Sequence, residues 1–235
     1  MAKRKQSELD SIVENYIEKK KFKVALAELE KLQEKEEVNG RILYYLGICN
    51  ANLGEFRRAT ELLEEALNHS DLSLIFQIHS LLLLGYLYTE LKDYETAERS
   101  LKDALETNPQ SSTAYSALGY IYYQIKRYDL AIYNFKRAIQ IDPNNASAHN
   151  NLGYTYLEMN INLSEALNEC KKAVALDPKS AAYHDSLGWA YYMLGNYEAA
   201  VDELEKALKL PTKYKEVIEE HYKSAIKKRN EISRA

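Results

Sequence analysis

The apolar and small residues between positions 112 and 145 fall into two successive stretches with the period of an α-helix. In the first stretch they follow the i, i+3, i+4, i+7 spacing that places side chains on one face of a helix. These positions are Tyr115, Leu118, Gly119 and Tyr122. A second face follows at Ala131, Phe135, Ala138 and Ile139. Pro143 ends the second stretch, because proline lacks a backbone N–H and disfavours helix in the residue before it. The segment therefore predicts a pair of helices.

Proline and glycine repeat this unit along the chain. The four prolines are spaced 34, 35 and 33 residues apart, at Pro109, Pro143, Pro178 and Pro211. Five of the eight glycines keep spacings of 38, 34, 34 and 35, at Gly47, Gly85, Gly119, Gly153 and Gly188. A fixed period in this range is typical of stacked repeats.

The glycines need a physical reason, since a glycine inside a helix costs about 0.5–1 kcal/mol relative to alanine. Five of them cost roughly 2.5–5 kcal/mol in sum. Close approach of the two helices of a pair explains this cost, because a side chain at Gly119 would push the helices apart. Ala131 and Ala138 suit the same tight contact.

The period divides residues 6–212 into six repeats, which start near positions 6, 40, 78, 112, 146 and 181. The first repeat is degenerate, since Val13 takes the glycine position. Four extra residues separate the second and third repeats around 68–73, and the fifth repeat has one extra residue in its turn around 160–163. We expect the stacking to deviate at these two places. Residues 1–5 form a basic N-terminal tail.

A further helix is predicted over residues 213–235. Its apolar positions form a stripe, made by Tyr214, Val217, Ile218, His221, Tyr222, Ala225 and Ile226. A stack of repeats needs a terminal element that covers the apolar face of its last member. We therefore interpret 213–235 as a C-terminal capping helix.

The composition of the chain limits the class of protein and the cellular compartment that we expect. The chain has 235 residues, 46% of them hydrophobic, and a formal net charge of −4. Its two cysteines, Cys49 and Cys170, supply no disulfide framework. The start of the chain lacks the apolar core of a secretory signal, and the richest apolar stretch, 81–88, is far shorter than the roughly 20 residues that span a bilayer. We expect a cytoplasmic protein without a membrane segment.

No catalytic constellation stands out. The sequence has no glycine-rich nucleotide loop and no nucleophile elbow. His149 and His184 occupy the same repeat position and could be neighbours, but no third ligand accompanies them, so zinc is disfavoured against a core role. We predict that the chain is not an enzyme and binds no cofactor or metal.

The segment 112–145 resembles the tetratricopeptide repeat (TPR), through Tyr-x-x-Leu-Gly-x-x-Tyr, Ala-x-x-x-Phe, Ala and Pro. The resemblance covers about residues 6–212. It implies an all-α, right-handed solenoid of about six helix-turn-helix repeats. It also implies that the first helix of each pair lines a concave groove, which holds an extended peptide or a helix of a partner.

The family's inward-facing positions identify candidate partner-binding residues. Most are aromatic: Tyr44, Tyr45, Tyr86, Tyr120, Tyr123, Asn150, Asn151, Tyr154, Trp189 and Tyr192. Exposed aromatics with polar tips are good anchors for a partner chain, and asparagine amides can pair with a peptide backbone. The alternative is that a tyrosine at these positions only packs between neighbouring helices.

Charge narrows the choice of partner. The inward positions carry six acids, Asp10, Glu14, Glu18, Glu90, Glu158 and Asp185, and a single base, Arg41. Nucleic acid needs a basic footprint and is not expected to bind. Some family members clamp an acidic C-terminal tail with lysine, asparagine and arginine from successive repeats. Asn151 matches one element only, so no such carboxylate clamp is predicted. A neutral-to-basic, apolar-rich segment of another protein is the expected ligand.

Two functions compete at this point. The first is an adaptor or scaffold that binds another protein in the groove. The second is a structural or co-chaperone-like subunit that docks into a larger assembly through its convex face or its end caps.

Overall fold

The computed structural model of this chain describes residues 7–35 and 39–233. The predicted tail, 1–5, and the predicted start of the first repeat lie outside the described residues. Every regular element in the described ranges is helical, and consecutive helices pack as antiparallel pairs of a solenoid. The all-α prediction is confirmed.

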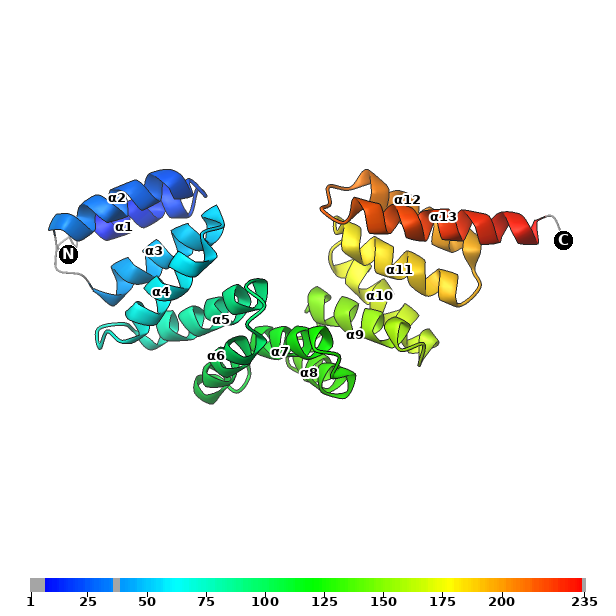
Figure 1. Ribbon diagram of the computed structural model, residues 1–235, viewed down its shortest axis with the longest axis horizontal. Helices are drawn as coiled ribbons and strands as arrows, with labels where there is room; N and C mark the ends of the chain where they lie inside the picture. Colours follow the sequence, from blue (N-terminus) through cyan, green and yellow to red (C-terminus); the bar gives the residue numbers. More distant parts are fainter. Residues whose placement is uncertain (1–6, 36–38, 234–235) are drawn as a thin grey trace, which may run out of the picture. The chain divides into compact units, whose positions relative to one another are not determined.

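The chain forms two compact bodies, an N-terminal body of residues 1–109 and a C-terminal body of residues 110–235 (Figure 1). The N-terminal body contains α1 (Glu8–Ile12), the π-helix η1 (Val13–Ile17), α2 (Phe22–Lys35), α3 (Gly40–Leu53), α4 (Phe56–Leu67), α5 (Leu74–Glu90) and α6 (Tyr94–Thr107). The C-terminal body contains α7 (Ser112–Gln124), α8 (Tyr128–Ile141), α9 (Ala146–Glu158), α10 (Leu163–Leu176), α11 (Ala181–Met193), α12 (Tyr197–Lys209) and α13 (Lys215–Ile232).

Local sequence signals set the ends of the helices. The side-chain oxygens of Ser111 and Asn145 accept hydrogen bonds from the backbone N–H groups of Ala114 (3.2 Å) and Ala148 (2.9 Å), which caps α7 and α9. Each of the four prolines stands two residues beyond the last residue of a helix, after α6, α8, α10 and α12. Proline therefore marks the end of the second helix of a pair, as the sequence predicted.

The five helical glycines lie where the two helices of a pair approach most closely. A Cβ atom added to Gly119 would lie 2.6 Å from two ring atoms of Phe135, and one added to Gly153 would lie 2.7 Å from Cys170 Sγ. In the other three pairs the clash would involve a leucine, at 2.7 Å for Gly47, 2.5 Å for Gly85 and 2.6 Å for Gly188. Carbon atoms in contact normally lie about 3.5–4.0 Å apart. Close approach is therefore the reason for glycine at these positions.

A residue with left-handed backbone geometry lies in the turn inside each pair. The angle φ is positive at Lys20, Gly54, Lys92, Lys126, Asn160 and Gly195. The fifth turn contains a second such residue, Asn162, with φ 48°. The extra residue of the fifth repeat therefore lies in the turn. As a result, the side chain that contacts the glycine belongs to the seventeenth residue after it in this repeat, whereas it belongs to the sixteenth in the other four pairs.

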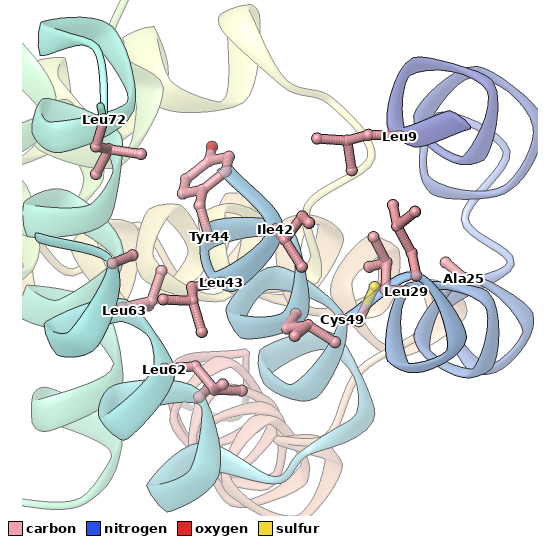
Figure 2. Close-up of a cluster of buried hydrophobic side chains, with 14 of the residues drawn as sticks. Leu9, Ala25, Leu29, Ile42, Leu43, Tyr44, Cys49, Leu62, Leu63 and Leu72 are labelled. Atoms are coloured by element: carbon pink, nitrogen blue, oxygen red, sulfur yellow. The ribbon is translucent and has the colours of Figure 1, made fainter. Parts of the chain in front are cut away.

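Much of the core of the N-terminal body is a cluster of buried side chains that extends from α1 to α5 (Figure 2). Leu29 of α2, Leu43 of α3 and Leu63 of α4 are fully buried in it. Each pair thus completes its core against the next pair, which is the general rule for stacked repeats.

Two features of this body differ from the regular repeat. The first helix widens into the π-helix η1, where Glu18 N–H donates to the Val13 carbonyl at 3.0 Å. The π-helix begins at Val13, the branched residue that takes the glycine position of the first repeat. The four extra residues were predicted around 68–73; the connection from α4 to α5 spans these positions, and α5 begins at Leu74, about one turn before the predicted start of the third repeat.

The last helix, α13, packs on α12. Its residues Ile218 and Ala225 are fully buried in a cluster with Leu204 and Ala207 of α12. Residues 213 and 214 precede the helix, and residues 234–235 lie outside the described residues. The part of the predicted apolar stripe that comprises Ile218, Tyr222, Ala225 and Ile226 therefore faces the last repeat.

Candidate partner-binding site

A cavity of about 230 Å³ lies in the C-terminal body. Side chains from the first helices of three successive pairs, α7, α9 and α11, line it together with Phe135 of α8, Tyr214 and the beginning of α13. The lining residues are Tyr120, Tyr123, Phe135, Asn150, Asn151, Tyr154, Ala182, Asp185, Ser186, Tyr214, Val217 and Ile218. The cavity is thus bounded by repeats and by the capping helix.

Five of the ten predicted partner-binding residues meet at this cavity. They are the candidates on α7 and α9: Tyr120, Tyr123, Asn150, Asn151 and Tyr154. Sequence reasoning missed the contribution of Tyr214, which precedes α13, and of Val217 and Ile218 within that helix. The apolar stripe of 213–235 gave a signal for this helix, but the stripe was assigned only to covering the last repeat.

The tyrosines of α7 and α9 form an aromatic wall. Tyr120 is 39% exposed, while Tyr123 and Tyr154 are half-buried with ring centres 6.1 Å apart. Burial raises the pKa of Tyr123, and the nearby Tyr154 and Glu158 raise it further. The phenols of Tyr123 and Tyr154, whose pKa values are both raised, stay protonated and keep a hydrogen-bond donor at neutral pH.

The two asparagines of α9 differ in environment. Asn151 is half-buried, and its Nδ2 donates to Ser147 Oγ at 3.5 Å. Asn150 is only 8% exposed, and its Oδ1 atom has no hydrogen-bond partner. A buried amide oxygen without a donor is costly, but this atom is closed off from solvent, so a ligand in the cavity does not reach it in this structure.

The predicted residues of α11 contact the capping helix. Trp189 stacks between Tyr192, at 4.6 Å between ring centres, and His221 of α13, at 4.3 Å. His221 Nδ1 lies 2.8 Å from Asp185 Oδ1, which joins α13 to α11 beside the cavity. Trp189 and Tyr192 therefore do not line the cavity, and a binding role for them stays a prediction.

The remaining three candidates lie in the N-terminal body. Tyr44 and Tyr45 pack against Phe76 of the extended α5, with ring centres 4.8 and 5.9 Å away. Tyr44 is buried, and this burial raises its pKa to about 12. Tyr86 is 51% exposed on α5. Tyr44 thus packs between helices, whereas Tyr86 is accessible to a partner.

The charge that lines the cavity is negative. Among its lining residues, all of which lie in the described ranges, Asp185 carries a charge and no lysine or arginine is present. In the N-terminal body, the guanidinium of Arg41 donates to Asp10 Oδ1 at 2.8 Å. The base among the inward-facing positions is therefore paired with an acid.

The two histidines of the shared repeat position make equivalent bonds, each with a carboxylate of the second helix of its own pair. His149 Nδ1 bonds to Glu169, and His184 Nδ1 lies 2.6 Å from Glu203 Oε2. Their Nε2 atoms lie 2.9 and 3.1 Å from the carbonyl oxygens of the prolines that precede α9 and α11. The histidines thus join the two helices of a pair to the preceding turn.

Glu169 also accepts a bond from Lys172 Nζ at 2.8 Å. Burial alone would raise the pKa of Glu169, but the hydrogen bonds from Lys172 and His149 outweigh burial and hold the pKa below its ordinary value. In the part of the chain that the structure describes, no group of three His, Cys, Asp or Glu residues is arranged to hold a metal ion.

Within the described ranges, every helix is too short or too polar to serve as a transmembrane span. The antiparallel pairs, the periodic glycines and the hollow on the first helices define a helical-repeat protein.

Comparison with known families identifies the repeat. Family profiles described as tetratricopeptide repeat match residues 13–72, 78–111, 146–180 and 181–210, and one described as TPR repeat matches 119–160. Together these matches cover most of the chain, including much of the degenerate first repeat. The chain belongs to the tetratricopeptide-repeat family.

Solved structures show the same fold. The crystal structure of MamA protein is 26% identical to this chain, with a TM-score of 0.57 over 72% of this chain and 90% of that one. TTC0263, a thermophilic TPR protein of Thermus thermophilus, is 22% identical, with a TM-score of 0.63 over 80% of this chain and 98% of that one.

A chain of the APC/C hetero-tetramer Cut9-Hcn1 is 18% identical, with a TM-score of 0.78 over 93% of this chain and 42% of that one. A comparison with curated protein sequences finds no significant match. TPR proteins generally mediate protein–protein interactions and are usually not catalytic.

Proposed function

We propose that this chain is an adaptor or scaffold that binds a segment of another protein at the cavity between α7, α9, α11 and α13. The observation that carries the proposal is the meeting of five sequence-predicted residues around one hollow of about 230 Å³. One water molecule needs only about 10–15 Å³ of such space. The hollow is therefore large enough for a side chain of a partner.

The character of the lining supports a neutral-to-basic, apolar-rich segment. Tyr214, just before α13, and Val217 of α13 are 50% and 47% exposed at the hollow, and Asp185 supplies negative charge. A buried core of aromatic and aliphatic side chains with few polar groups is what a binding hot spot requires. The acidic tail of a carboxylate-clamp ligand would be repelled by Asp185.

The test is a pull-down from native lysate with three full-length baits. The first is the wild type, and the second carries Tyr120→Ala and Asn151→Ala. The third carries Tyr133→Ala and Asn168→Ala, a matched pair of exposed residues on α8 and α10, the second helices of the same two repeats. Circular dichroism and thermal melting check that all three are folded.

We expect partners that the wild type and the Tyr133/Asn168 variant capture but the Tyr120/Asn151 variant loses. Identical partner sets for the three baits would contradict binding at the cavity.

The second candidate function is a subunit that docks into an assembly through another surface. The specific observation in its favour is the added turn of α5, where Leu74 and Ile75 are 59% and 65% exposed. Leu74→Gln with Ile75→Gln would then remove the partners, while the Tyr120/Asn151 variant would retain them.

A further inference from the structure

The walls of the cavity favour a cation. Four tyrosines line it, Tyr120, Tyr123, Tyr154 and Tyr214, and the faces of aromatic rings attract positive groups. Tyr214 already illustrates this, since the Lys213 ammonium lies 5.2 Å from the centre of its ring. An anion would find neither a lining lysine nor a lining arginine among the described residues.

The charges around the cavity agree with this preference. Asp185 lines it, and Glu158 lies close enough to Tyr123 and Tyr154 to influence both phenols. Burial first, then Glu158 and Asp185, raise the pKa of Tyr154. His221 on α13 bonds to Oδ1 of Asp185 and is the titratable group that faces this carboxylate from the capping helix.

We propose that the cavity receives an arginine side chain of the partner segment. This inference rests on the proposed function and specifies its ligand. A guanidinium is planar and can stack on tyrosine rings while its N–H groups donate to the carboxylate of Asp185. An ammonium has no plane to stack and is more strongly hydrated, so lysine fits the same lining less well.

The probe is a fluorescein-labelled, capped peptide, Ala-Leu-Arg-Leu-Ala, titrated with the full-length protein and followed by fluorescence anisotropy. Three peptides replace its arginine with citrulline, lysine or glutamate. Citrulline keeps the shape and N–H groups but loses the charge, whereas lysine keeps the charge but loses the plane. We expect the arginine peptide to bind about fivefold or more tighter than the citrulline and lysine peptides, and the glutamate peptide to bind weakest.

Variants place the effect in the cavity. Tyr120→Ala should weaken the arginine peptide by about fivefold or more, whereas the matched control Tyr133→Ala should leave it unchanged. Asp185→Asn keeps an acceptor for His221 but removes the charge. It should therefore reduce the difference between the arginine and citrulline peptides.

Equal binding of the arginine, citrulline and glutamate peptides would overturn the inference, and so would lysine binding as tightly as arginine or no binding of the arginine peptide at millimolar protein. The lysate pull-down separates these failures. If it still loses partners only with the Tyr120/Asn151 variant, the adaptor function stands and only the arginine ligand is wrong. If it does not, the adaptor function fails as well.

Discussion

Substituting alanine for Gly119 tests the close contact that defines each helix pair. An added Cβ atom would lie 2.6 Å from Cδ1 and Cε1 of Phe135, whose side chain is fully buried on α8. Ordinary carbon contacts are about 3.5–4.0 Å long, so the overlap is about 1 Å. The ring is enclosed by other core residues, and it cannot move away without disturbing them.

The magnitude follows from two opposing terms. Alanine is better than glycine in a helix by about 1 kcal/mol. Overpacking of a well-packed core typically costs about 1–3 kcal/mol, and an overlap with an enclosed ring belongs at the upper end. We expect a net loss of about 2 kcal/mol, which for a chain of this size lowers Tm by about 4–8 °C.

The assay is thermal melting of the full chain followed by circular dichroism, with hydrogen exchange of the peptides from residues 112–141. Thr113→Ala is the matched control, because this exposed position lies on the same helix and gains only helix propensity. Phe135→Ala, alone and combined with Gly119→Ala, completes a double-mutant cycle. The destabilisation by Gly119→Ala should vanish once the ring is absent. A Tm that rises after Gly119→Ala as much as after Thr113→Ala would refute the reasoning.

Three other predictions concern single residues. Gly195 has φ 79°, and a Cβ atom added to it would meet no other atom within 4 Å. Gly195→Ala should therefore destabilise the chain by about 1 kcal/mol through backbone strain alone, whereas Gly195→Asn should cost less in the same denaturation curve. The pKa of Glu169 is lowered, so its stabilising contribution is present above the ordinary value of 4.5 and is lost as the pH falls through the folded-state pKa. The stability difference between wild type and Glu169→Gln should accordingly shrink in urea denaturation as the pH drops from 7 to 3; a constant difference would contradict the assignment. Burial raises the pKa of the Cys49 and Cys170 thiols to about 12, so neither should react with Ellman's reagent at pH 8 until guanidinium unfolds the chain.

The regular part of the fold could be predicted because its signals are local. The spacing of Tyr115, Leu118 and Tyr122 defines one helix face, and Pro143 ends the next helix. Gly119 indicated a close contact before its partner was known, because glycine in a helix is costly unless a neighbour needs the space.

The sequence failed to predict the fold where one local sequence pattern is compatible with more than one structure. The four extra residues between the second and third repeats could lengthen a connection or a helix, and packing of Phe76 against Tyr44 and Tyr45 accompanies the helix. Likewise, Val13 marked a degenerate repeat, but the period alone gave no reason to expect the π-helix that follows.

The sequence by itself thus determined the repeat, the helix pairs, the reason for the glycines and five of the twelve residues that line the cavity, because periodicity and helix-ending residues act within a few turns of the chain. Only the tertiary structure decided which candidates share a cavity. The lining of that cavity by Tyr214 and Val217 depends on how α13 packs after the period has ended. The unpaired oxygen of Asn150 is likewise a property of the packed state, since whether a buried acceptor meets a donor depends on the side chains that surround it in space.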